Sequence, residues 1–83
     1  MSQLPRLSGR ELVKVLCKVG FVVKRQQGSH IVLRRENPWA QSVVPDHKEL
    51  DRGTLRAILR QTRVTVQELL SLLNDSRPTT LQP

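Results

Sequence analysis

The residues best suited to chemistry lie in the segment Gly28-Ser29-His30. An apolar, β-branched run follows His30 and ends in Arg34 and Arg35. An imidazole can take and give a proton near neutral pH, and neighbouring arginines can bind phosphate and stabilise charge developing on it. Because RNA supplies its own nucleophile, the 2′-hydroxyl, such a site could cleave RNA without a metal or cofactor. The alternative is a surface strand histidine that makes only a hydrogen bond.

His47 is the second of the two histidines and follows Val44-Pro45-Asp46. By analogy with two-base RNA cleavage, it is a candidate for a second acid or base. The alternative is a loop histidine hydrogen-bonded to the backbone. No cluster of cysteines or carboxylates accompanies the two histidines, so no metal site is predicted.

The residues expected to support His30 in the active site all precede it in the chain. They are Lys24, Arg25, Gly28 and Ser29. The strand-like segments on either side of Gln27-Gly28 predict a β-hairpin. A two-residue turn at Gln27-Gly28 would place Arg25 directly opposite His30 on the same face. A longer loop would move that partner by one residue and reverse the faces. Both faces carry apolar side chains, so the sequence leaves the register open.

Three arginines recur at helical spacing in the C-terminal half of the chain, namely Arg52, Arg56 and Arg60. Acidic residues that would neutralise them at i,i+4 spacing are missing, so the stripe favours RNA phosphates or an acidic partner. The alternative is an ordinary solvated helix face.

Composition narrows the class of partner. The 83 residues carry a net charge of +7, which favours a polyanion, with nucleic acid the first candidate. Phe21 and Trp39 are the only Phe, Tyr or Trp residues, so an extended base-stacking surface is not predicted. Trp39 itself could stack on a base or cap a hairpin loop. No apolar run is long enough to span a membrane and no signal-peptide core is present, so we expect a cytoplasmic protein.

The order of predicted elements indicates an α+β fold of the type α-β-β-β-α with a short extra C-terminal helix. We expect a helix over 9–18, strands over 21–26, 29–35 and 41–44, and helices capped by Asp51 and Thr65. The three strands should form an antiparallel sheet with the helices on one face. Residues 1–73 are predicted to form one domain, and residues 74–83 a disordered polar tail.

Short motifs in a fixed order extend this interpretation. They are Ser8-Gly9-Arg10-Glu11, Gly20-Phe21, Arg25-Gln26, Gly28-Ser29-His30, Val44-Pro45 with His47, and Gly53-Thr54-Leu55-Arg56 with Ile58-Leu59. In this series the chain resembles the HicA (YcfA-like) toxins, the small mRNA interferases of bacterial type II toxin–antitoxin pairs. The resemblance runs from about Ser8 to Leu73.

The resemblance implies a double-stranded-RNA-binding-domain type of fold, with His30 as the catalytic histidine. It also implies cleavage of mRNA that blocks translation, and a HicB-type antitoxin that covers the active site. The loop before Lys48-Glu49-Leu50 is shorter than is usual in the family, and Pro38-Trp39 is individual to this chain. Two alternatives compete with a nuclease. One is a non-catalytic double-stranded-RNA-binding module, and the other is a DNA-binding regulator.

Overall fold

The computed structural model describes residues 4–74. Within these residues, three helices and three strands follow one another in the order predicted from the sequence. Their bounds are α1 Gly9–Lys18, β1 Val22–Gln27, β2 His30–Glu36, β3 Trp39–Pro45, α2 Arg52–Thr62 and α3 Val66–Asn74. The α+β class, the three-stranded antiparallel sheet and the extra C-terminal helix are all confirmed.

Helix α1 begins where local side chains satisfy its free backbone groups. The Ser8 hydroxyl accepts a hydrogen bond from the Glu11 N–H at 3.1 Å, and the Glu11 carboxylate accepts one from the Ser8 N–H at 2.7 Å. This reciprocal pair is the predicted capping box. The apolar side of the helix buries Leu12, Val15 and Leu16, as the sequence spacing indicated.

The β1–β2 hairpin turns one residue later than the sequence suggested. Its loop is Gly28-Ser29, and Gln27 rather than Arg25 lies opposite His30. The reason is local, because Gly28 occupies the first loop position with a φ of +57°, which glycine adopts without steric cost. A register shift between Val23 and Arg25 marks a β-bulge at Lys24, which re-aligns the rest of β1. The pairing of Arg25 with His30, which a two-residue turn at Gln27-Gly28 would have produced, is therefore not formed.

Strand β3 is longer than expected and includes Trp39 and Pro45. Only Asn37-Pro38 separate it from β2, and the peptide bond between them is cis. Its inward side chains are Ala40, Ser42 and Val44, all buried. Two of the three are small or polar, which explains why the sequence pattern under-predicts this strand.

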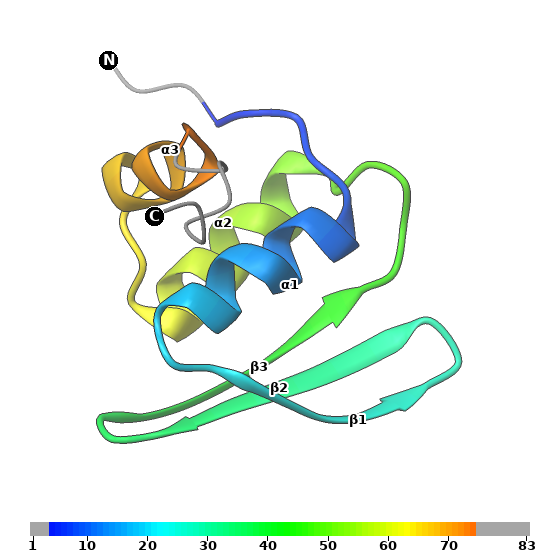
Figure 1. Ribbon diagram of the computed structural model, residues 1–83. Helices are drawn as coiled ribbons and strands as arrows, with labels where there is room; N and C mark the ends of the chain where they lie inside the picture. The colour runs from blue at the N-terminus through cyan, green and yellow to red at the C-terminus, as the bar shows by residue number, and fades with distance from the viewer. Residues whose placement is uncertain (1–3, 75–83) are drawn as a thin grey trace, which may run out of the picture.

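The molecule has two layers, and one face of the sheet is uncovered (Figure 1). All three helices lie on the same side of the sheet, which has the strand order β1-β2-β3. The core between the layers is built from Leu12 and Leu16 of α1, Ile31 and Leu33 of β2, and apolar residues of α2 and α3. Alternation along β2 therefore directs Ile31 and Leu33 inward and His30 to the open face.

Helices α2 and α3 also begin at their predicted caps. The Asp51 carboxylate accepts hydrogen bonds from the Thr54 N–H at 3.2 Å and the Thr54 hydroxyl at 2.6 Å. Thr65 and Glu68 form a second reciprocal capping box. Asn74 is the last residue of α3, and the rest of the predicted polar tail lies outside the described residues. None of the helices within residues 4–74 has the length and apolar character needed to cross a membrane.

Candidate active site

His30 lies at the tip of the β1–β2 hairpin. It is the first residue of β2 and pairs with Gln27 on one side and with Pro45 on the other. The residue is exposed, as are Gly28 and Ser29 before it. A phosphodiester can therefore reach the imidazole from solvent without any opening of the fold.

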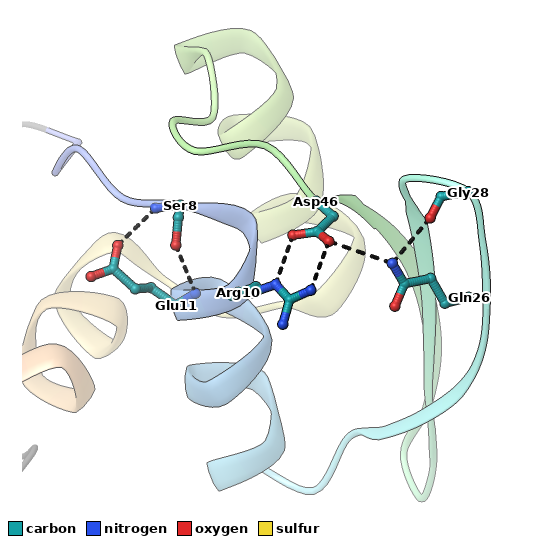
Figure 2. A network of polar contacts seen from close by, with 6 residues as sticks. All are labelled: Ser8, Arg10, Glu11, Gln26, Gly28 and Asp46. Atoms are coloured by element: carbon teal, nitrogen blue, oxygen red, sulfur yellow. Dashed lines mark hydrogen bonds and ion pairs between the residues drawn. The ribbon is translucent and has the colours of Figure 1, made fainter.

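A polar network centred on Asp46 holds the hairpin loop in place (Figure 2). The Asp46 N–H donates to the Ser29 carbonyl at 2.6 Å. Its carboxylate accepts two hydrogen bonds from Arg10, at 3.0 and 3.1 Å, and one from the Gln26 amide at 3.4 Å. The same Gln26 amide donates to the Gly28 carbonyl at 3.0 Å. The start of α1, the loop after β3 and the hairpin beside His30 are thus tied together.

The ion pair in this network changes the ionisation of both partners. The Arg10 hydrogen bond is the main cause that holds the pKa of the Asp46 carboxyl below its ordinary value of 3.8, with Gln26 and the His47 imidazole acting in the same direction. The same contact raises the pKa of the Arg10 guanidinium. Asp46 is therefore ionised throughout the neutral range, and the bidentate geometry gives the pair a fixed orientation.

The Asp46 network should make part of the stability acid-sensitive. Since the carboxyl pKa is lower in the folded state, its contribution is fully present above pH 3.8 and is lost as the pH falls further through the folded-state pKa. We expect Asp46→Asn to flatten the fall in unfolding free energy over that acid range. Urea unfolding at stepped pH measures this. Glu49→Gln, which removes a looser surface carboxylate, is the matched control. The prediction would be contradicted if the unfolding free energy of Asp46→Asn fell below pH 3.8 as steeply as that of the wild type.

The second histidine lies at the same end of the molecule. His47 follows Pro45, the β3 partner of His30, by two residues. Its backbone carbonyl accepts a hydrogen bond from the Gly9 N–H at 2.9 Å, and its side chain is exposed. Neither imidazole makes a hydrogen bond to another group within residues 4–74, so both are available to a ligand.

The predicted basic supporters of His30 share its face. Arg25 pairs with Val32, two residues along β2 from His30, and Lys24 is the bulged residue beside it. Both are exposed, and within the described chain neither side chain makes an ion pair. The bulge thus places two unneutralised cations on consecutive residues next to the hairpin tip.

The two arginines that close β2 have different surroundings. The Arg34 Nε donates to Gln41 at 3.1 Å across the open face. The Arg35 side chain instead enters the helix-covered side, where it donates to the carbonyls of Pro38, Val19 and Thr62 at 3.0, 3.3 and 3.5 Å. Its guanidinium also lies 4.6 Å from the centre of the Phe21 ring. These contacts engage Arg35 in linking β2 to the helices, whereas Arg34 faces outward.

The arginine stripe is not on the same face as His30. Arg52, Arg56 and Arg60 are exposed along α2, which lies in the helix layer (Figure 1). His30 belongs to the open face of the sheet, because side chains alternate along β2 and Ile31 faces the helices. Within residues 4–74 none of the three forms an ion pair. The stripe is therefore a second basic surface, separate from the hairpin.

Sequence reasoning did not identify Arg10, Gln26 and Asp46 as site residues. Arg10 and Asp46 are 36 positions apart, and Gln26 and Asp46 are 20 apart. No local periodicity connects such residues, so only their place in the fold reveals the network. The described part of the chain also contains no group of three or more His, Cys, Asp or Glu side chains arranged to hold a metal ion.

A comparison with models of protein families finds a match. Residues 9–64 match the family model described as the HicA toxin of bacterial toxin–antitoxin systems. A comparison with curated proteins finds no significant match. The matched region contains the hairpin, both histidines, the Asp46 network and the arginine helix, and it covers more than half of the 83 residues. The chain therefore belongs to the HicA toxin family and is the toxin component of a toxin–antitoxin system.

Proposed function

We propose that this chain is a metal-independent endoribonuclease that cleaves mRNA and so blocks translation. The observation that carries the proposal is the exposed position of His30 at the hairpin tip, on the same face as Lys24 and Arg25, which form no ion pair within residues 4–74. Membership of the HicA family supports RNA as the substrate. Since translating mRNA is the proposed substrate, we expect the toxin to act in the cytoplasm.

The chemistry follows from the groups at the hairpin tip. As general base, His30 takes the proton of the RNA 2′-hydroxyl while that oxygen attacks the neighbouring phosphorus. The new 2′-O–P bond forms as the P–O5′ bond breaks, and the leaving 5′-oxygen takes a proton from an acid. His47, at the same end of the molecule, is the candidate for that acid. The alternative is that His30 itself supplies the proton.

The other residues of the site stabilise charge or position His30, and they take no part in proton transfer. Lys24 and Arg25 stabilise the negative charge that builds on the phosphorane, because a cation placed there acts on charge that exists only in the transition state. Gly28 and Ser29 form the two-residue loop that presents the imidazole. The Asp46 network keeps this loop against the start of α1, so His30 meets the substrate in a preset position.

The neutralising partner is a HicB-type antitoxin with acidic groups. The basic surfaces offered to it or to RNA phosphates are Arg34 on the sheet and Arg52, Arg56 and Arg60 on α2, which stay exposed or half-exposed. Arg35 adds its positive charge from the helix-covered side, where backbone carbonyls accept hydrogen bonds from its guanidinium. Covering the His30 face would block substrate access without altering the toxin.

The decisive experiment is cleavage of an unstructured RNA by the purified chain in EDTA, with analysis of the product ends. We expect cutting, with a 2′,3′-cyclic phosphate or 3′-phosphate on one fragment and a 5′-hydroxyl on the other. Products with 5′-phosphate ends would contradict attack by the 2′-hydroxyl. Absence of cutting together with tight binding to duplex RNA would favour a non-catalytic double-stranded-RNA-binding module.

A further inference from the structure

The uncovered face of the sheet carries a continuous set of side chains that begins at His30. Cross-strand partners share a face, and alternate residues of one strand do so as well. The register therefore groups His30, Val32, Arg34 and Glu36 of β2 with Pro45, Val43, Gln41 and Trp39 of β3. Across the seven residues from His30 to Glu36 this face extends about 20 Å.

The far end of this face carries the largest exposed apolar side chain of the described residues. Trp39 pairs with Glu36 and is 62% exposed. Phe21, the other large aromatic residue, is buried in the core and is unavailable to a ligand. Exposed Val22 and Val43 lie between Trp39 and the hairpin tip. Val32, which pairs with Arg25 and Val43, is buried although the register places it on this face.

The charge on this face is predominantly positive. Lys24 lines a depression at the β1 edge of the sheet, where Val22 and Arg34 of the open face meet Gly20 and Arg35. The bulge sets Arg25 beside Lys24, opposite Val32. Arg34 uses its Nε on Gln41 and its Nη1 faces Glu36, which leaves Nη2, among the described residues, for another acceptor. Glu36 is the single acidic side chain that the register places here, and it lies 3.9 Å from Arg34.

This combination fits one class of ligand. We propose that a single-stranded RNA lies along the open sheet face, with its scissile phosphate at His30, its backbone on Lys24, Arg25 and Arg34, and a base stacked on Trp39. Cations that track a backbone and an aromatic ring that stacks a base are the two parts of single-strand binding sites. The inference rests on the proposed nuclease function and adds the path of the substrate.

The position of Trp39 makes the path measurable. It is the only tryptophan, and the chain has no tyrosine, so the intrinsic tryptophan emission comes from this one site. A base stacked on the indole should quench or shift this emission. Because Trp39 is largely exposed and outside the core, its replacement should not disturb folding.

The experiment titrates an unstructured RNA of about twelve nucleotides into the full chain carrying His30→Ala, which keeps the RNA uncut. Trp39 emission and the anisotropy of end-labelled RNA are recorded together. We expect both signals to follow one saturable curve. Adding Trp39→Ala should weaken binding about tenfold, whereas Trp39→Phe, which keeps a ring, should recover most of the affinity.

A matched pair of lysine variants tests the backbone contacts. Lys24→Ala should make the slope of log K against log salt shallower by about 0.7, the value for one phosphate contact on a single strand. Lys14→Ala removes the same charge from an exposed position of α1 on the helix side. It should leave the slope unchanged. Equal slopes for Lys24→Ala and Lys14→Ala would overturn the path.

Two further results separate this inference from the nuclease function itself. Suppose that the wild-type chain and Trp39→Ala cleave RNA with the same KM, and that RNA does not change the Trp39 emission. The substrate then binds along another surface, and only the proposed path is wrong. Emission that responds to a purified acidic antitoxin but not to RNA would assign this face to a protein partner, which also overturns the path. If the wild-type chain neither binds nor cleaves RNA, both proposals fail.

Discussion

Replacing His30 by alanine is expected to slow RNA cleavage by about 100- to 10,000-fold, the usual contribution of a positioned general acid or base. The imidazole is the proton-transfer group at the hairpin tip, and its removal leaves the cations that bind phosphate. We therefore expect the loss mainly in kcat, with RNA affinity little changed. Single-turnover cleavage in EDTA measures this, beside thermal unfolding to confirm that the variant folds.

His47→Ala is the matched comparison, because it removes the same side chain from an exposed position at the same end of the molecule. If His47 protonates the leaving oxygen, its loss should lower the rate strongly and remove one limb of a bell-shaped pH–rate profile. If His47 is an ordinary loop histidine, the rate and profile should match the wild type. Equal cleavage by the wild type and His30→Ala would place the activity at another residue or in a contaminant.

Replacing Gly9 by alanine is expected to cause the largest loss of stability among the glycine substitutions. A Cβ on Gly9 would overlap the carbonyl oxygen of Pro45 and lie 3.2 Å from the Asp46 Cα. Both obstacles are backbone atoms, which cannot rotate away as a side chain can. The helix start and the loop after β3 would have to separate, at a cost of about 3 kcal/mol.

Gly9→Ala should also disturb the candidate active site. The displaced segment carries Asp46 and His47, and it pairs with His30 through Pro45. Gly53→Ala is the control at the second residue of α2, where the nearest atom to a new Cβ is the Asp51 Oδ2 at 3.4 Å. That variant should range from neutral to about 1 kcal/mol more stable. Urea unfolding distinguishes the two variants. Similar unfolding midpoints would contradict the prediction, because they would mean that the backbone at Gly9 moves apart with little loss of unfolding free energy.

The helix starts were predictable because their interactions are local. Ser8 with Glu11, Asp51 with Thr54, and Thr65 with Glu68 are each three positions apart, within one helical turn. Such contacts form in the same way wherever the helix lies in the fold. The apolar spacing that buries one side of α1 and α2 is equally local.

The hairpin was predictable as a hairpin but not in its register. Apolar residues on both faces removed the pattern that normally decides which side is buried. The decision came from the positive φ of Gly28, which moved the turn by one residue, and from the bulge at Lys24. As a result, Arg25 lies diagonally from His30 on the open face rather than opposite it.

The sequence by itself determined the α-β-β-β-α order with its extra helix, the helix caps and the exposed turn that presents His30. Only the tertiary structure decided that Arg35 enters the helix side, that the α2 stripe lies apart from His30, and that Asp46 joins α1 to the hairpin. The physical reason is distance along the chain. Caps and turns depend on neighbours within a few residues, whereas these contacts exist only after the helices have packed on one face of the sheet.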